Sequence, residues 1–388
     1  MKTDCGYLRN GIFVEPTAMD GKFKPCCLIK TFPDKKYTHN TIEEQIGAMN
    51  DPEYLYENFK NNICYKCTQE EKIDPTFGPR INSVKTINKH EIKPGQVAFL
   101  QVAFSAFCNF KCLYCGPHSS TEWNKDIEEI QKRNIPFDHN HLAIQTTPQQ
   151  TFVREKEIIN DLKKLDLSKL REVGVFGGEP FMTRHLDEFL QIITERAKTE
   201  KTVIQFNTNA SVFPKQSIID QLTKFDTVDL RISGESVGSL AEYIRSGLNW
   251  EQYNSNIKKW KELSKEYPNI ELRLHMAHSV YNVNKLKETE EWLLDNNLTP
   301  YNAFVRGPHY TDIRKVLSKQ HINECIKIVS DLKTEMIREP LIKFLNNDYY
   351  NQEALKDYRD FTHKLDIVRG TSLQVVNPQL YEWTFTDF

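Results

Sequence analysis

From Val97 onward, short β-like runs alternate with longer helical patterns along the chain. The short runs are rich in β-branched and aromatic residues, and the longer segments place apolar residues near i, i+3, i+4 and i+7. We expect strands at Val97–Phe104, Arg171–Phe176, Thr202–Phe206, Thr227–Ile232, Ile270–Met276 and Tyr301–Val305, and helices at Arg154–Leu170, His185–Thr199 and Trp250–Tyr267. This alternation predicts an α/β fold with a parallel sheet. The six expected strands are fewer than the eight of a closed βα barrel.

Composition excludes several classes of protein. The chain has 388 residues, of which 39% are hydrophobic and 27% charged, and its formal net charge is −2. These values fit a globular protein of one or two domains, with no general attraction to nucleic acid, so nucleic acid is not an expected partner. The first residues, MKTDCGYLRN, lack the pattern of a secretion signal, and no apolar run is long enough to span a membrane. We expect a cytoplasmic protein without a membrane partner.

Eight of the nine cysteines lie within the first 115 residues. In a reducing compartment, clustered cysteines are more often metal ligands or catalytic groups than disulfides. Cys108, Cys112 and Cys115 form a C-x3-C-x2-C pattern directly after the first β-like run. Three thiolates can hold three irons of a cubane cluster and leave the fourth iron open. Structural zinc normally takes four protein ligands, so the triplet favours an iron–sulfur cluster over zinc.

Two motifs carry a resemblance to a known family. The segment CNFKCLYC resembles the cluster-binding signature of the radical S-adenosylmethionine (SAM) superfamily. After the second β-like run, the tetrapeptide GGEP at 177–180 resembles a second motif of that family. Paired glycines let a backbone approach a ligand closely, and a carboxylate can receive an ammonium group. The resemblance implies an open, partial (β/α)6 TIM-like barrel in which the three cysteines hold a SAM-coordinating [4Fe-4S] cluster.

The resemblance also implies which residues contact SAM. In this superfamily the GGEP loop receives the amine of SAM, and polar residues at the carboxyl ends of the strands contact its ribose and carboxylate. The cofactor-binding residues expected here are Tyr114, Gly177, Gly178, Glu179, Pro180, Asn207, Ser233, Arg245 and Asn282. Strand four is followed by glycine where the family often has an acidic residue, and Glu235 is a possible replacement. The substrate-side candidates are Tyr114, Tyr243, His275 and His278, and no catalytic residue is assigned.

A second group of cysteines precedes the expected sheet. Residues 11–16 and 22–25 read as a hairpin, which would bring Cys5 and Cys26 together. With the later pair, the expected ligands are Cys5, Cys26, Cys64 and Cys67; Cys27 is an alternative to Cys26. Four thiolates suit either a fully ligated [4Fe-4S] cluster or tetrahedral zinc. The pattern resembles the auxiliary-cluster region of the SPASM and twitch subfamilies, which implies a second [4Fe-4S] cluster. In those subfamilies the region usually follows the barrel, whereas here it precedes it.

Three regions are therefore expected. They are a Cys-rich, twitch-like module at 1–90, a radical SAM partial barrel at 95–310, and a helical C-terminal extension with a tail at 311–388. Residues 123–150 exceed the usual length of a βα connection and predict an insertion. The final aromatic segment, LYEWTFTDF, is expected either to pack as a strand against the N-terminal module or to engage a partner.

The resemblance implies an enzyme that reductively cleaves SAM to a 5′-deoxyadenosyl radical, which abstracts hydrogen from a substrate. Related enzymes mostly modify peptides or proteins, so a peptide or protein is the expected substrate. An electron donor such as flavodoxin or ferredoxin is the expected redox partner. Two alternatives stay open: the same radical chemistry on a small molecule or nucleotide-sugar, and a non-catalytic, zinc-stabilised binding protein.

Overall fold

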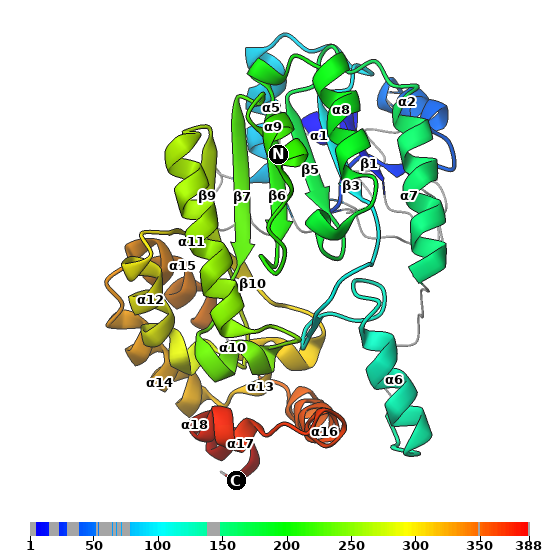
Figure 1. Ribbon diagram of the computed structural model, residues 1–388. Helices are drawn as coiled ribbons and strands as arrows, with labels where there is room; N and C mark the ends of the chain where they lie inside the picture. Colours follow the sequence, from blue (N-terminus) through cyan, green and yellow to red (C-terminus); the bar gives the residue numbers. More distant parts are fainter. Residues whose placement is uncertain are drawn as a thin grey trace.

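The centre of the structure is an open, mostly parallel sheet with helices packed against it (Figure 1). The computed structural model describes residues 5–14, 23–28, 39–51, 53, 64, 67, 71, 78–137, 148–347 and 350–386. Within these residues the sheet contains β1 (Gly11–Val14), β2 (Phe23–Lys24), β3 (Phe99–Ala103), β5 (Glu172–Phe176), β6 (Val203–Thr208), β7 (Thr227–Ser233), β9 (Ile270–His278) and β10 (Thr299–Phe304). Their order is β10-β9-β7-β6-β5-β3-β1-β2.

The six predicted strands are all present, as β3, β5, β6, β7, β9 and β10. They pair in parallel and follow one another across the sheet in chain order. The predicted α/β class with a parallel sheet is therefore confirmed. Alternation along β6 shows how the two faces differ, because Ile204 and Phe206 are buried whereas Gln205 and Asn207 are partly exposed.

The predicted N-terminal hairpin is present, since β1 pairs antiparallel with β2 and Phe13 lies opposite Lys24. Its first strand also pairs in parallel with β3, with Ile12 opposite Leu100. The hairpin therefore extends the same sheet that contains the later strands, an arrangement that the sequence did not predict. The helices of this end are α1 (Gly6–Asn10), α2 (Ile42–Met49) and α5 (Pro79–Lys89).

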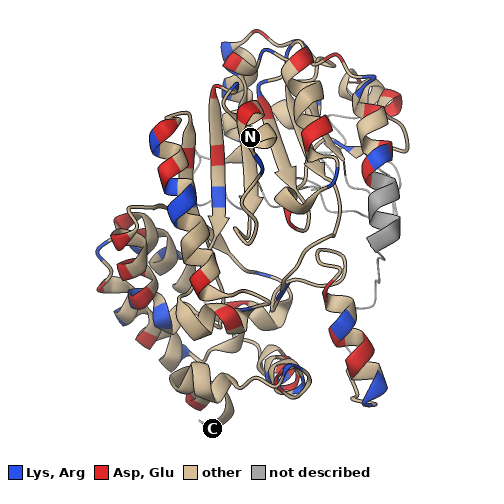
Figure 2. Ribbon diagram, in the orientation of Figure 1, with Lys and Arg blue, Asp and Glu red and all other residues tan. Residues whose placement is uncertain are grey.

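Helices connect and follow the parallel strands. They are α6 (Trp123–Lys132), α7 (Pro148–Leu162), α8 (Leu186–Arg196), α9 (Gln216–Leu222), α10 (Gly238–Ile244), α11 (Trp250–Glu266) and α12 (Leu286–Asp295), with short 3-10 helices η3 (Pro180–Met182), η4 (Thr199–Lys201), η5 (Val283–Lys285) and η6 (His309–Thr311). Phe189 of α8 packs edge-on against Phe104, with ring centroids 5.0 Å apart. Basic and acidic residues are interspersed along helices such as α11 (Figure 2).

Two sequence-based predictions about helices need correction. The predicted helix at 154–170 is α7, which ends at Leu162, because the chain then turns and Ser168 donates its N–H to Asp166. Part of the predicted insertion at 123–150 is the helix α6, and residues 138–147 lie outside the described part of the chain.

The C-terminal region is helical, with α13 (Ile313–Val316), α14 (Lys319–Ser330), α15 (Glu335–Leu345), α16 (Gln352–Arg369), α17 (Leu373–Val376), α18 (Pro378–Tyr381) and the π-helix η7 (Glu382–Thr386). The final segment is thus not a strand against the N-terminal module. Trp383 instead stacks on His321 of α14 at 5.0 Å, and α17 and α18 lie at the end of the molecule opposite α1 and α5 (Figure 1). None of the described helices combines the length and apolarity that crossing a membrane requires.

Candidate functional site

The loop with the three cysteines begins where β3 ends, at the carboxyl edge of the sheet. The thiols of Cys112 and Cys115 are hydrogen-bonded to each other, and the charges of Cys108 and Cys112 interact. Burial raises the pKa of Cys108 to about 12. Among the residues that the structure describes, no three His, Cys, Asp or Glu side chains gather tightly enough to hold a single metal ion. In a cubane each thiolate binds a different iron, and the thiol donor set of this loop fits that group.

A short two-stranded sheet fixes the cysteine loop to the segment that contains Arg245. Here β4 (Lys111–Cys112) pairs antiparallel with β8 (Arg245–Ser246), so that Cys112 lies opposite Arg245. The N–H of Leu113 donates to the carbonyl of Ile244 at 2.9 Å. The segment at 244–247, IRSG, is therefore a structural support of the cysteine loop.

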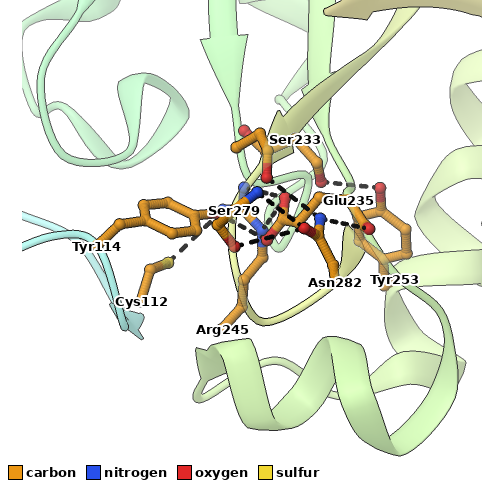
Figure 3. A network of polar contacts seen from close by, with 9 residues as sticks. Cys112, Tyr114, Ser233, Glu235, Arg245, Tyr253, Ser279 and Asn282 are labelled. Carbon is orange, nitrogen blue, oxygen red and sulfur yellow. Dashed lines mark hydrogen bonds and ion pairs between the residues drawn. The ribbon is translucent and has the colours of Figure 1, made fainter. Parts of the chain in front are cut away.

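Buried polar residues form a network beside Cys112 (Figure 3). Nη1 of Arg245 lies 3.6 Å from Sγ of Cys112, and Nη2 donates to Oε2 of Glu235 at 2.7 Å. The hydroxyl of Tyr114 donates to the other oxygen of Glu235 at 2.6 Å. The hydrogen bond with Cys115 and the charge of Arg245 together lower the pKa of Cys112 despite its burial. Glu235 thus balances the charge of Arg245, a partner that sequence reasoning considered only as a replacement for a missing acid.

The fully buried Asn282 connects two loops in the same network. Its Nδ2 donates to the carbonyl of Glu235 at 2.9 Å, and its Oδ1 accepts the N–H of Ser279 at 2.8 Å. The carbonyl of Ser233 accepts the Tyr253 hydroxyl at 2.9 Å. Asn282 and Ser233 therefore fix the ends of β9 and β7 (Figure 3).

The GGEP loop packs directly against the segment that leads into Cys108. Gly178 donates its N–H to Ser105 at 2.7 Å, and Glu179 donates its N–H to Phe107 at 2.9 Å. A Cβ at Gly178 would lie 2.2 Å from the Phe107 carbonyl oxygen, and Gly177 has a φ of +113°. Both glycines are thus required by the conformation, and Pro180 begins the 3-10 helix η3.

The carboxylate of Glu179 is buried and accepts hydrogen bonds from three protein donors. It accepts the Thr208 hydroxyl at 2.7 Å and the N–H of Asn209 at 2.6 Å, and it also accepts the N–H of Phe181 at 3.2 Å. Burial raises its pKa to about 7. Nδ2 of Asn209 in turn lies 3.6 Å from Sγ of Cys108. Glu179 therefore joins the GGEP loop, the end of β6 and the cysteine loop, a link that the motif alone does not reveal.

The other predicted residues differ in their surroundings. The Oδ1 of Asn207 is buried and has no hydrogen-bond partner within the described residues, so it presents an unoccupied acceptor. Tyr243 is buried and hydrogen-bonds to Asp366 of α16, which places it in the packing of the C-terminal helices. His275 contacts the ring of Tyr301, with centroids 5.4 Å apart.

The N-terminal cysteines gather around the start of the hairpin. Cys5 and Cys26 are buried in one cluster with Leu8, and Cys64 packs against it. Burial is the main cause that raises the pKa of Cys26, and the neighbouring Cys27, Cys5 and Cys64 add to it. The pKa of Cys64 rises to about 12, again mainly through burial, with Cys5 and Cys67 adding to it. The four expected ligands therefore lie within electrostatic reach of one another, together with Cys27.

Residues 102–293 match the family model of the radical SAM superfamily. They form a radical SAM domain. The match begins within β3, contains both the cysteine loop and the GGEP loop, and ends within α12. Membership of this superfamily indicates an enzyme and implies a [4Fe-4S] cluster and SAM.

Individual relatives are distant. GTP 3′,8-cyclase of Nautilia profundicola is 24% identical over 107 residues, which cover 28% of this chain and 26% of the cyclase. Among solved structures, Streptococcus suis SuiB bound to S-adenosylmethionine is 17% identical, with 72% of this chain and 58% of SuiB covered and a TM-score of 0.35. Native anSMEcpe with bound AdoMet and the Cp18Cys peptide is 13% identical, with 71% of this chain and 66% of anSMEcpe covered and a TM-score of 0.39. The chain thus spans about a quarter of the cyclase's length and less than two thirds of these two structures.

Proposed function

We propose that this radical SAM enzyme holds its SAM-coordinating cluster on Cys108, Cys112 and Cys115 and modifies a peptide or protein. One observation supports the placement of the cluster. The cysteine loop is joined to the IRSG segment through the β4–β8 pair and to the GGEP loop through backbone hydrogen bonds. Segments that are far apart in the sequence thus meet around the three thiols.

When bound, the cluster supplies the electron that cleaves SAM to methionine and a 5′-deoxyadenosyl radical, which then takes hydrogen from the substrate. The residues of the chain position and shield this site. Arg245 provides a buried cation beside Cys112, and Glu179 holds the end of β6 against the cysteine loop. Asn207 offers its unpartnered Oδ1 to a hydroxyl of the ribose.

The N-terminal thiols are the proposed ligands of an auxiliary [4Fe-4S] cluster. Cys26 is the proposed ligand rather than Cys27, because Cys26 is the more buried of the two and its charge interacts with those of Cys5 and Cys64. The N–H of Cys27 donates to Oε1 of Gln101 at 3.0 Å, which ties this group to β3. Flavodoxin or ferredoxin is the proposed reductant.

Two substrate classes compete within this chemistry. The resemblance of the N-terminal cysteines to the SPASM and twitch subfamilies favours a peptide or protein. The similarity to GTP 3′,8-cyclase over 107 residues favours a nucleotide or another small molecule. Comparing 5′-deoxyadenosine formation with GTP and with short peptides encoded near this protein distinguishes them, because the true substrate increases the yield.

The test of the radical chemistry is anaerobic reconstitution with iron and sulfide, followed by dithionite and SAM. We expect the wild-type chain to form 5′-deoxyadenosine and Cys112→Ala to form none. Cys325→Ala is the matched control, because Cys325 is buried in α14 and belongs to neither group of thiols. Equal product from the wild type and Cys112→Ala, or a colourless protein with stoichiometric zinc, would refute the proposal.

A further inference from the structure

The C-terminal helix α16 reaches the cysteine loop through a buried ion pair. Nε of Arg369, the last residue of α16, donates to Oδ2 of Asp126 in α6 at 2.8 Å. The two side chains are only 3% and 4% exposed. The other oxygen of Asp126 pairs with Lys111, the residue directly before Cys112.

An aromatic ring makes a second connection between Arg369 and the cysteine loop. The guanidinium of Arg369 lies over the ring of Trp123, 4.7 Å from its centroid. Nε1 of Trp123 donates to the carbonyl of Cys112 at 3.2 Å. Arg369 therefore contacts two residues that hold β4: Asp126 pairs with the side chain of Lys111, and Trp123 binds the backbone of Cys112.

The charges of this group do not cancel. Arg369 and Lys111 carry two positive charges against the single negative charge of Asp126, whereas Arg245 is balanced by Glu235. Both terminal nitrogens of Arg369 are buried, and neither has a hydrogen-bond partner within the described residues. A buried charge is screened much less than one in water, so its field extends to the loop.

We propose that Arg369 is a positioning residue of the cluster site, whose buried positive charge raises the reduction potential of the cluster. The inference rests on the proposed function, which places that cluster on Cys108, Cys112 and Cys115. Reduction adds negative charge to a cluster, and a fixed cation nearby stabilises the reduced form. The C-terminal extension, for which the sequence predicts no contact with the cysteine loop, is then part of the redox site.

The experiment is an anaerobic redox titration of the reconstituted full chain, followed by electron paramagnetic resonance. The signal that changes when SAM is added identifies the cluster with the open iron. Arg369→Gln is expected to shift its midpoint potential to more negative values, and Arg369→Lys is expected to keep it. Asp126→Asn removes the opposite charge and is expected to shift the potential to more positive values.

Arg133→Gln is the matched control. Arg133 joins the same two helices, because its Nη1 donates to the carbonyl of Ile367 at 3.2 Å, but its side chain is 45% exposed. If loss of helix contact were the cause, this variant would shift the potential as Arg369→Gln does, and that result would overturn the inference. An unchanged midpoint potential in Arg369→Gln would also overturn the inference, and so would equal shifts in Arg369→Gln and Arg369→Lys. If Arg369→Gln does not fold, a positive shift in Asp126→Asn supports the inference and no shift overturns it. Absence of any cluster from the reconstituted wild type would instead refute the proposed function.

Discussion

Cys112 and Arg245 lie opposite each other in the β4–β8 pair, with Nη1 of the arginine 3.6 Å from the sulfur. Oε2 of Glu235 accepts hydrogen bonds from the same guanidinium, from Nε at 3.1 Å and from Nη2 at 2.7 Å. Both charged side chains are buried, so each depends on the other for charge balance. Removing one member leaves the other as an uncompensated charge in the protein interior.

The first prediction concerns this pair. Arg245→Gln is expected to lower the free energy of unfolding of the apoprotein by about 3–5 kcal/mol, because Glu235 then remains buried and charged. Glu235→Gln in the same chain should recover part of that loss, since no unpaired charge remains. Urea unfolding of the two single variants and the double variant measures both effects. A double variant as unstable as the sum of the single variants would show that the pair is not coupled.

The second prediction concerns Gly178. In Gly178→Ala, the new Cβ would lie 2.2 Å from the Phe107 carbonyl oxygen, so the GGEP loop must move away from the cysteine loop. We expect about 1–3 kcal/mol of destabilisation and roughly a 100-fold loss of 5′-deoxyadenosine formation. Gly47→Ala is the control, because Gly47 is exposed in α2 and a Cβ there meets no atom within 4 Å. That control should keep full activity; equal activity of both variants would contradict the role of the loop.

The sheet was largely predictable from the sequence because its strands depend on local pattern. The buried residues of β5, β6 and β7 are mostly β-branched or apolar, and helical periodicity separates these strands. The hairpin was predictable from its turn, but its pairing with β3 was not. The pairing joins β1 to a strand far along the chain, and no local pattern in either segment indicates that neighbour.

The polar contacts of the site were not predictable, because they depend on distances between residues far apart in the chain. The motif presents Glu179 as a carboxylate for an ammonium group, but it does not reveal that three protein groups donate to that carboxylate. The resemblance gives Arg245 only as a cofactor-binding residue, and its ion pair with Glu235 appears only in the structure. The contact of Arg369 with Asp126 joins residues 243 positions apart, and no local pattern signals it.

The third prediction concerns the auxiliary site. If the N-terminal thiols hold a [4Fe-4S] cluster, the reconstituted wild type contains about eight irons per chain and Cys67→Ala about four. The SAM-dependent signal of the remaining cluster should persist, because the three thiols near β4 are unchanged. Iron, sulfide and zinc analysis of both proteins tests this, with Cys325→Ala as the control for loss of a buried thiol. Unchanged iron in Cys67→Ala, or one zinc in place of four irons, would contradict it.

The fourth prediction follows from the burial of His278. Its side chain is fully buried, its Nε2 lies 2.8 Å from Oδ1 of Asn302, and its Nδ1 has no partner among the described residues. Burial lowers its pKa to about 4, below the value of about 6.5 in an unfolded chain. Between these values the unfolded state binds a proton that the folded state does not. Stability from this group is therefore complete above about pH 6.5 and is lost as the pH falls toward about 4.

Urea unfolding of the apoprotein at about pH 7.5 and about pH 5 measures this effect. Because His278 takes up a proton only in the unfolded state, the free energy of unfolding of the wild type is expected to be lower at about pH 5, on the order of 2 kcal/mol. His278→Gln keeps a polar group toward Asn302 but does not titrate. Between the two pH values its free energy of unfolding should therefore fall by about 2 kcal/mol less than that of the wild type. His363→Gln, at an exposed position of α16, should keep the wild-type dependence. Parallel pH dependences of the wild type and His278→Gln would show that His278 is not held neutral in the folded protein.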